Sequence, residues 1–299
     1  MLVTEIYNGQ GLGNQLACYI TTRVVARDKG FEFGVMNPHK LKCLSFIDVD
    51  FGQPVLGGSG PEGGPPTALP EGIKYYFREK SINLNDRLRT NIAIDDPDLE
   101  NILDNTKLDG LFQSENRIIH RKQEIKQWLK VHKDKDNYTY SSDNICVINF
   151  RGGEYVNVPE FFLPQSYWNN SVKHMLTINP NFKFVVVTDD PFTARRFFPA
   201  NFIITHSEIW NDYTIIKNAH YLILSNSSFP YYPVLTSDTI KYIIAPKYWG
   251  RHNVSDGYWS LGYNIYRNHT YMDREGKIFT YEQCIEEFNN YINKHKLYG

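Results

Sequence analysis

Three short segments, far apart in the sequence, carry the residue types that bind phosphate. They are Asn8-Gly-Gln-Gly-Leu-Gly-Asn-Gln-Leu16, Asn149-Phe-Arg-Gly-Gly-Glu-Tyr155 and Leu224-Ser-Asn-Ser-Ser-Phe-Pro-Tyr-Tyr232. Each follows an apolar run that is typical of a buried strand. Loops at the carboxyl ends of such strands are where α/β proteins hold nucleotides. Together the segments indicate a nucleotide-diphosphate site that is assembled from separated parts of the chain.

The first segment predicts a strand, a glycine-rich turn and a helix. Residues 2–7 have the pattern of a strand, and Gly9, Gly11 and Gly13 allow a tight turn with close backbone approach. Asn14 is expected to cap the amphipathic helix that follows, whose free N–H groups and dipole favour an anion. The dinucleotide fingerprint fails at its third glycine, where Asn14 stands. A purely structural turn is an equally good interpretation.

The other two segments also have a functional and a structural interpretation. Arg151 follows a predicted strand and precedes a Gly-Gly turn, where a guanidinium can bind phosphate through two parallel hydrogen bonds. An exposed ion pair between Arg151 and Glu154 is the alternative. The run from Ser225 to Ser228 offers hydroxyl and backbone N–H groups to an oxyanion. Taken alone, that run is explained more simply as a turn that caps the next helix.

The order of the three segments resembles that of the α-1,2-fucosyltransferase family, glycosyltransferase family 11. The resemblance covers most of the chain, from Tyr7 to about Trp249. Three further segments are similar to segments of that family, namely Leu108-Asp-Gly-Leu-Phe-Gln-Ser-Glu115, Val186-Val-Thr-Asp-Asp-Pro191 and Ile243-Ile-Ala-Pro-Lys-Tyr-Trp249.

The middle motif departs from the family pattern, His-x-Arg-Arg-Gly-Asp-Tyr. Asn149 takes the place of His, Gly152 that of the second Arg, and Glu154 that of Asp. Arg151 aligns with the first Arg, which the resemblance implies should hold the β-phosphate. We expect these changes to affect the identity of the sugar more than the class of reaction.

The fold that the resemblance implies is GT-B, an α/β architecture of two Rossmann-like domains that face a central cleft. We place the domain boundary in the charged segment 132–138. Residues 1–138 then form an N-terminal domain on the acceptor side, and residues 139–299 form the donor domain, which a helix over 280–292 closes. The glycine- and proline-rich segment 57–72 is expected to be a mobile surface loop. Alternating helices and strands predict a parallel, doubly wound sheet in the donor domain, with strands near 145–149, 183–188, 202–205, 220–224 and 240–245.

The activity that the resemblance implies is an inverting transfer of L-fucose from GDP-fucose to a glycan hydroxyl, in an α-1,2 linkage. Arg151 and the strand-end loops would neutralise the leaving diphosphate. Glu154 is the candidate base and Glu115 the reserve. For Asp189 and Asp190, which would contact guanine or ribose, a cap for the next helix is the alternative. The expected donor contacts are Gly11, Gly13, Asn14, Gln15, Asn149, Arg151, Asp189, Asp190, Ser225, Asn226, Ser227, Ser228 and Phe229. The expected acceptor contacts are Gln113 and Glu115.

Three other functions remain open at this point. The first is a transferase of the same fold that uses another nucleotide sugar, since Asn149 and Gly152 change the donor motif. The second is an NAD-linked enzyme that uses the Gly9 loop. The third is a non-catalytic carbohydrate- or nucleotide-binding protein, which the loss of His and of the second Arg keeps open.

Composition excludes several other classes. The chain has 41% hydrophobic residues and a net charge of −1, so no basic surface for nucleic acid is indicated. Its four cysteines are widely spaced and are expected to be buried free thiols. Two Asp-x-Asp pairs could hold a cation, but Asp134 and Asp136 are expected in a solvated loop, and Asp48 and Asp50 are weak candidates. We expect no metal or other cofactor, no transmembrane segment, and a soluble, cytoplasmic protein.

Overall fold

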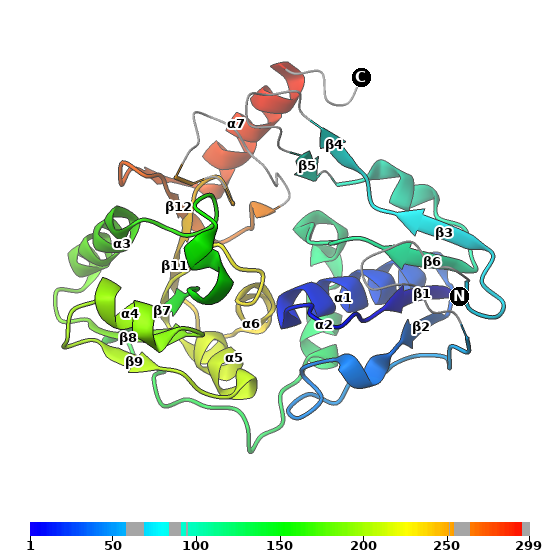
Figure 1. The fold of residues 1–299 in the computed structure, drawn as a ribbon, viewed down its shortest axis with the longest axis horizontal. Helices are drawn as coiled ribbons and strands as arrows, with labels where there is room; N and C mark the ends of the chain where they lie inside the picture. The colour runs from blue at the N-terminus through cyan, green and yellow to red at the C-terminus, as the bar shows by residue number, and fades with distance from the viewer. Residues whose placement is uncertain (58–68, 84–90, 94, 251, 254–263, 295–299) are drawn as a thin grey trace. The chain divides into compact units, whose positions relative to one another are not determined.

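The computed structural model describes residues 1–57, 69–83, 91–93, 95–250, 252–253 and 264–294 (Figure 1). The chain divides into two compact units. The first comprises Met1–Ser81 and Ile94–His132, and the second comprises Ile82–Ala93 and Lys133–Gly299. Most of the loop expected over residues 57–72 lies outside the described residues.

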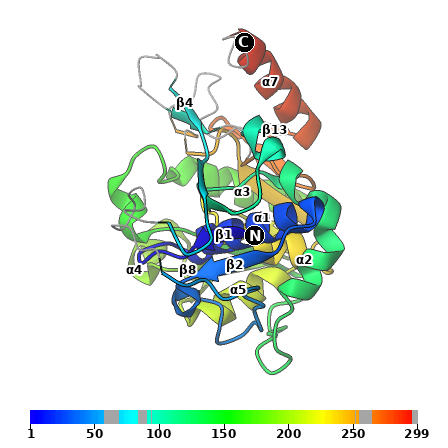
Figure 2. The ribbon, with the colours of Figure 1, turned by 90° about the vertical axis from the view of Figure 1, so that its right-hand side faces the viewer.

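A four-stranded parallel sheet forms the centre of the first unit, in the order β2-β1-β6-β3. The long helix α1 packs against β1 (Figure 2), and its Leu16, Ile20 and Val24 are fully buried. This fourfold spacing of apolar residues explains why the segment forms a helix. The strands are β1 (Leu2–Glu5), β2 (Phe33–Met36), β3 (Tyr75–Arg78) and β6 (Thr106–Asp109). The helices are α1 (Leu12–Lys29), η1 (Pro38–Lys40), η2 (Pro97–Asn101), η3 (Glu115–Arg117), η4 (Ile119–Arg121) and α2 (Lys122–Trp128).

The second unit contains a seven-stranded sheet in the order β13-β12-β11-β10-β7-β8-β9, in which only the β12–β13 pair is antiparallel. Its strands are β7 (Ile145–Phe150), β8 (Lys183–Thr188), β9 (Ile203–Thr205), β10 (Tyr221–Ile223), β11 (Tyr242–Pro246), β12 (Thr270–Met272) and β13 (Ile278–Phe279). Its helices are η5 (Gly153–Asn157), α3 (Gln165–Ile178), α4 (Pro191–Phe197), α5 (Ile209–Asn218), α6 (Tyr231–Thr236) and α7 (Tyr281–Lys294). A separate two-stranded sheet joins β4 (Ser81–Asn83) and β5 (Asn91–Ala93).

Alternate residues of the central strands of this sheet point into two different cores. Cys146 and Ile148 belong to a core that also contains residues of α3 and α4. Val147, between them, belongs to the core that contains residues of α5 and α7. Helices therefore cover both faces, and the strands are continuous apolar runs. The predicted α/β class with parallel sheets is confirmed, and the five predicted strands lie within two residues of the observed ones.

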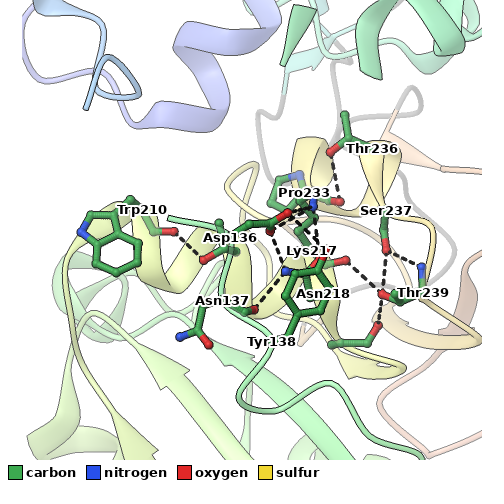
Figure 3. Close-up of polar contacts among 12 residues, drawn as sticks. Asp136, Asn137, Tyr138, Trp210, Lys217, Asn218, Pro233, Thr236, Ser237 and Thr239 are labelled. Carbon is green, nitrogen blue, oxygen red and sulfur yellow. Dashed lines mark hydrogen bonds and ion pairs between the residues drawn. The ribbon is translucent and has the colours of Figure 1, made fainter. Parts of the chain in front are cut away.

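The segment that leads into β7 is held by a polar network on the last turn of α5 (Figure 3). The carboxylate of Asp136 accepts hydrogen bonds from Lys217 Nζ at 3.0 and 3.1 Å and from Asn218 Nδ2 at 2.7 Å. Asn218 Nδ2 also donates to the carbonyl oxygen of Asn137 at 2.9 Å. The side chain of Asp136 is only 19% exposed. The expectation that Asp136 is solvated was therefore wrong, because its carboxylate anchors the segment to α5.

All four cysteines are buried and free, as expected. Cys18 and Cys43 lie in the first unit, and Cys146 and Cys284 lie in the second. Burial raises the pKa of Cys18, Cys43 and Cys284 to about 12. No described helix combines the length and the apolar character needed to cross a membrane.

Candidate functional site

The strand order of the second unit creates a topological switch point between β7 and β10. From β7 the chain proceeds to β8 and β9, toward one edge of the sheet. It then returns to β10 and β11, which lie between β7 and the other edge. In sheets of this kind, ligands bind beyond the carboxyl ends of the strands at the point where the order reverses. The segments 149–155 and 224–232 follow β7 and β10, so both lie at this point.

A hydrogen bond joins these two segments. Ser225 Oγ donates to Asn149 Oδ1 at 3.1 Å, and both side chains are buried. Asn226 is fully buried, and its Nδ2 donates to the carbonyl oxygen of Phe161 at 3.0 Å. Ser227 and Ser228 are only partly buried. The structure therefore brings the second and third predicted segments together, with the two partly buried serines as the accessible part of the loop.

Phe229 has a packing role. Its N–H donates to Ser227 Oγ at 3.2 Å, and its ring packs against the core that contains Leu222 and Leu224. Its ring also lies edge-on to Tyr213 of α5, with centroids 6.4 Å apart. We therefore assign Phe229 to the support of the loop.

Arg151 is held between two carboxylates. Its Nη1 lies 2.6 Å from Asp189 Oδ2, and its Nη2 lies 2.5 Å from Glu154 Oε1. The guanidinium also lies over the ring of Tyr155, 5.2 Å from its centroid. The ion pair with Glu154 that was the structural alternative is therefore present. Because the Arg151 side chain is 32% exposed, its guanidinium is accessible to a ligand as well.

The glycines after Arg151 are required by packing. A Cβ on Gly152 would lie 2.6 Å from the Cβ of Asp190. Gly153 has a φ of +45°, and a Cβ there would lie 2.6 Å from Asp189 Oδ2. The Gly152 N–H donates to Asp189 Oδ1 at 2.9 Å, which ties the turn to the end of β8. An arginine at position 152 would collide with Asp190 unless the turn moved.

Asp190 caps α4. One of its oxygens accepts the N–H of Thr193 at 2.9 Å, and the other accepts the Thr193 hydroxyl at 2.6 Å. These hydrogen bonds from Thr193 hold the pKa of Asp190 below its usual range. The helix cap that the sequence left open as the alternative is therefore observed, and the donor contact of Asp190 stays a prediction.

In the first unit, the glycine-rich turn leads into α1 earlier than predicted. The N-cap is Gly11, without a side-chain cap, and the helix begins at Leu12. Asn14 therefore lies inside the first turn, and the expectation that it caps the helix was wrong. Gly9 has a φ of +77°, which explains its glycine. Gly11 has an ordinary φ, and a Cβ there would meet nothing within 4 Å, so packing does not require that glycine.

Gln15 is committed to the fold. It is 1% exposed, its Nε2 donates to the carbonyl of Lys40 at 3.0 Å, and its Oε1 accepts the N–H of Lys42 at 2.9 Å. Its side chain is therefore buried and bonded within the fold, and its donor contact stays a prediction. Gly13 is also buried in α1.

Gln113 and Glu115, the expected acceptor contacts, are 8% and 5% exposed. Gln113 Nε2 donates to Asn14 Oδ1 at 2.8 Å, so these two predicted residues lie together.

The first unit carries polar groups at the carboxyl edge of its sheet that the sequence did not single out. Lys107 forms an ion pair with Glu5, and both are almost fully buried. Asn37 Nδ2 also donates to Glu5, at 3.1 Å. Tyr76 donates its hydroxyl to Asp109 at 2.5 Å. The sequence did show a lysine and an aspartate in the short strand β6. This pattern is equally typical of a strand with one exposed face.

Two features of the second unit were also missed. Asp212, in the first turn of α5, accepts the Ser207 hydroxyl at 2.7 Å. Burial raises its pKa to about 6. A cavity of about 20 Å³ also opens beside Ser225 and Ser227, against aromatic residues that include Trp249 and Tyr266. For Asp212, the available signal was the His-Ser pair that directly follows β9.

The candidate metal ligands Asp48 and Asp50 each contact a different basic side chain. Asp48 lies 3.0 Å from His132 Nε2, and Asp50 pairs with Arg23 at 2.9 Å. Among the residues that the structure describes, no group of three or more His, Cys, Asp or Glu side chains is arranged to hold a metal ion.

Comparison with known proteins gives distant structural likenesses. No protein-family model matches the sequence, and no curated protein matches it. The solved structure of NodZ alpha-1,6-fucosyltransferase soaked with GDP-fucose has 13% sequence identity and a TM-score of 0.43, over 81% of this chain and 93% of that one. NodZ from Bradyrhizobium also matches with 13% identity, over the same share of this chain and 93% of its own, with a TM-score of 0.44. The ADP-heptose lps heptosyltransferase II of E. coli has 12% identity and a TM-score of 0.34, over 56% of this chain and 54% of its own.

Proposed function

We propose that this chain is an inverting glycosyltransferase that transfers L-fucose from GDP-fucose to a glycan hydroxyl, in an α-1,2 linkage. The observation that carries the proposal is the hydrogen bond between Ser225 and Asn149, which joins two phosphate-type loops at the switch point of the sheet. In α/β proteins, parallel sheets bind nucleotides beyond the carboxyl ends of the strands at such a switch point. The sequence resemblance described above supplies the donor and the linkage.

Arg151 is the group proposed to neutralise the leaving diphosphate. Breaking the bond between the anomeric carbon and the phosphate oxygen leaves negative charge on that oxygen, which a fixed guanidinium stabilises. A diphosphate reaching Arg151 would compete with Glu154, the more exposed of its two carboxylate partners at 67%. Displaced from Arg151, the Glu154 carboxylate would be available to take the proton of the acceptor hydroxyl as its oxygen bonds to the anomeric carbon. This exchange of partners would link donor binding to the activation of the acceptor.

Gly152 favours a second candidate, a transferase of this kind that uses a different nucleotide sugar. The family pattern has an arginine at this position, and the contact with Asp190 leaves no room for one. The donor site therefore has one guanidinium in this turn where the pattern has two. A nucleotide sugar whose diphosphate is bound by groups other than a second arginine would be consistent with the glycine at this position.

A panel of nucleotides tests the proposal and separates the two candidates. Thermal unfolding would be measured with GDP, UDP, dTDP and NAD at equal concentrations, and GDP is expected to raise the melting temperature most. GDP-fucose incubated with oligosaccharides that end in galactose should then release GDP. A preference for UDP or dTDP would replace the donor and keep the reaction class. Stabilisation by NAD alone would contradict the proposed function.

A further inference from the structure

A small cavity in the second unit borders the loop that is proposed to hold the diphosphate. It has a volume of about 20 Å³ and lies beside Ser225 and Ser227. Its walls come from the ends of β10 and β11, from the start of α6 and from the segment that enters β12. A cavity of this size admits a single group about as large as a methyl group or a water molecule. A small group attached to a bound diphosphate could therefore enter it.

Aromatic rings form the fixed part of the cavity walls. The ring of Tyr231 stacks on that of Tyr266, with centroids 4.2 Å apart and an interplanar angle of 27°. The Tyr271 hydroxyl accepts the N–H of Tyr266 at 2.6 Å and donates to its carbonyl oxygen at 3.1 Å. All three residues are at most 5% exposed, and Trp249 adds a further ring to the lining. Packing therefore sets the shape of the cavity, which is a property of sites that select a ligand by its size.

Three polar side chains of the lining have partners within the fold. The hydroxyl groups of Ser225 and Ser227 are hydrogen-bonded to neighbouring loop residues. His269 Nδ1 contacts the carbonyl oxygen of Arg267 at 3.0 Å, and burial lowers the pKa of His269 to about 4, so its ring is neutral at physiological pH. A lining of this kind favours an apolar group over a charged one. Its apolar side chains are those of Leu224, Pro230, Ala245 and Pro246.

We propose that this cavity receives the methyl group of a 6-deoxyhexose donor and selects that sugar over sugars in which the same carbon is absent or hydroxylated. This inference rests on the proposed function and adds to it the site that selects the donor sugar. L-Fucose is 6-deoxy-L-galactose, and its methyl group is attached to the ring carbon that the ring oxygen joins to the anomeric carbon. The methyl group therefore lies close to the diphosphate, which the loop beside the cavity is proposed to hold. The alternative occupant is an ordered water molecule, to which Asn264 and His269 could hydrogen-bond.

Calorimetric titration of the purified full chain with three nucleotide sugars distinguishes these occupants. GDP-D-arabinose has the ring of GDP-L-fucose without the methyl group, and GDP-L-galactose has a hydroxymethyl group in its place. The wild-type protein should bind GDP-L-fucose about tenfold or more tightly than GDP-D-arabinose, because one carbon in an apolar pocket typically discriminates about 10- to 200-fold. It should bind GDP-L-galactose about tenfold or more weakly than GDP-L-fucose, because the added hydroxyl needs more room and would lose its hydrogen bonds with water. GDP alone is the reference for the part of the ligand that all three share.

Trp249→Phe assigns the preference to this cavity. A phenyl ring is smaller than an indole, so the variant should enlarge the cavity and admit the hydroxymethyl group. The affinity for GDP-L-galactose should therefore rise severalfold relative to that for GDP-L-fucose. Trp210→Phe is the matched control, because Trp210 is a half-buried tryptophan of the same unit whose ring faces Lys135 and does not line the cavity. It should keep the wild-type ratio.

Equal affinities of the wild-type protein for the three nucleotide sugars would overturn the inference and favour a water molecule in the cavity. This comparison needs no variant, so it decides the question even if Trp249→Phe does not fold. A folded Trp249→Phe protein with the wild-type ratio of affinities would also overturn the inference. If neither GDP nor any of the three nucleotide sugars binds, the proposed function fails together with it. Binding of GDP without a preference among the sugars contradicts only the role of the cavity.

Discussion

Glu79 in the first unit should make the stability of this protein depend on pH. Its Oε2 accepts the N–H groups of Leu111 and Phe112 at 2.8 and 3.0 Å, and these fix a turn in which Phe112 has a φ of 48°. Burial raises the pKa of Glu79 from 4.5 to about 7, and the charges of Asp95 and Asp96 add to this effect. Between pH 4.5 and 7, Glu79 is therefore mainly protonated in the folded protein and mainly ionised in the unfolded chain. The free energy of unfolding must fall as the pH rises through this window.

The size of the effect follows from the shift. A rise of about 2.5 pKa units corresponds to about 3.5 kcal/mol, at about 1.4 kcal/mol for each unit. Partial exposure reduces this to about 2 kcal/mol. Glu79→Gln keeps an oxygen for the two N–H groups and removes the charge. The variant should therefore be about 2 kcal/mol more stable than the wild-type protein at pH 8 and about as stable at pH 4.5.

Urea unfolding at pH 4.5 and pH 8 measures this difference, and hydrogen exchange in peptides from β1 and α1 assigns it to the first unit. Glu71→Gln is the matched control, because Glu71 is an exposed residue of the same unit. It should change stability by less than about 0.5 kcal/mol at both pH values. Equal stability of Glu79→Gln and the wild-type protein at pH 8 would refute the reasoning. So would a gain of the same size at both pH values.

Three further predictions follow from contacts described above. Arg151→Lys should stay folded and lose about a hundred- to a thousandfold in kcat/KM, because a lysine cannot reproduce a bidentate phosphate contact; wild-type kinetics with GDP-fucose would remove Arg151 from the site. Lys107→Met should lower the free energy of unfolding by about 3–5 kcal/mol, because it leaves Glu5 buried without its cation. The double variant with Glu5→Gln should recover part of that loss, and no recovery in urea unfolding would contradict the pairing argument. Transfer should persist in excess EDTA, because fixed cationic and N–H groups are proposed to take the place of a cation; loss of activity with rescue by Mn²⁺ would contradict this.

The sequence predicted the sheet of the second unit well, for a physical reason. The segments around Val147 and Val186 are buried on both faces, so they are continuous apolar runs bounded by polar turns. Such runs are visible without knowledge of their neighbours. Loop positions after β7 and β10 follow directly from these strand ends, which is why Asn149 and Ser225 could be expected near one another.

Contacts between distant residues could not be predicted in the same way. Asp189 and Asp190 have the same side chain and adjacent positions, yet one pairs with Arg151 and the other caps α4. Their local sequence allowed both roles. Gln15 appeared to belong to a phosphate loop, but the start of α1 at Leu12 turns it toward the carbonyl of Lys40. In each case the outcome depends on a partner that sequence spacing does not identify.

Because the four cysteine thiols are distributed over both units, their reactivity can report the local opening of each unit. Each unit contains two cysteines, and all four are shielded from solvent. Only the exposed thiolate reacts readily with an alkylating reagent. The rate at which Cys18 and Cys43 are labelled therefore measures how often the first unit opens, and the rate for Cys146 and Cys284 measures the same for the second. A ligand that protects one pair and leaves the other unchanged would identify the unit that binds it, without any engineered label.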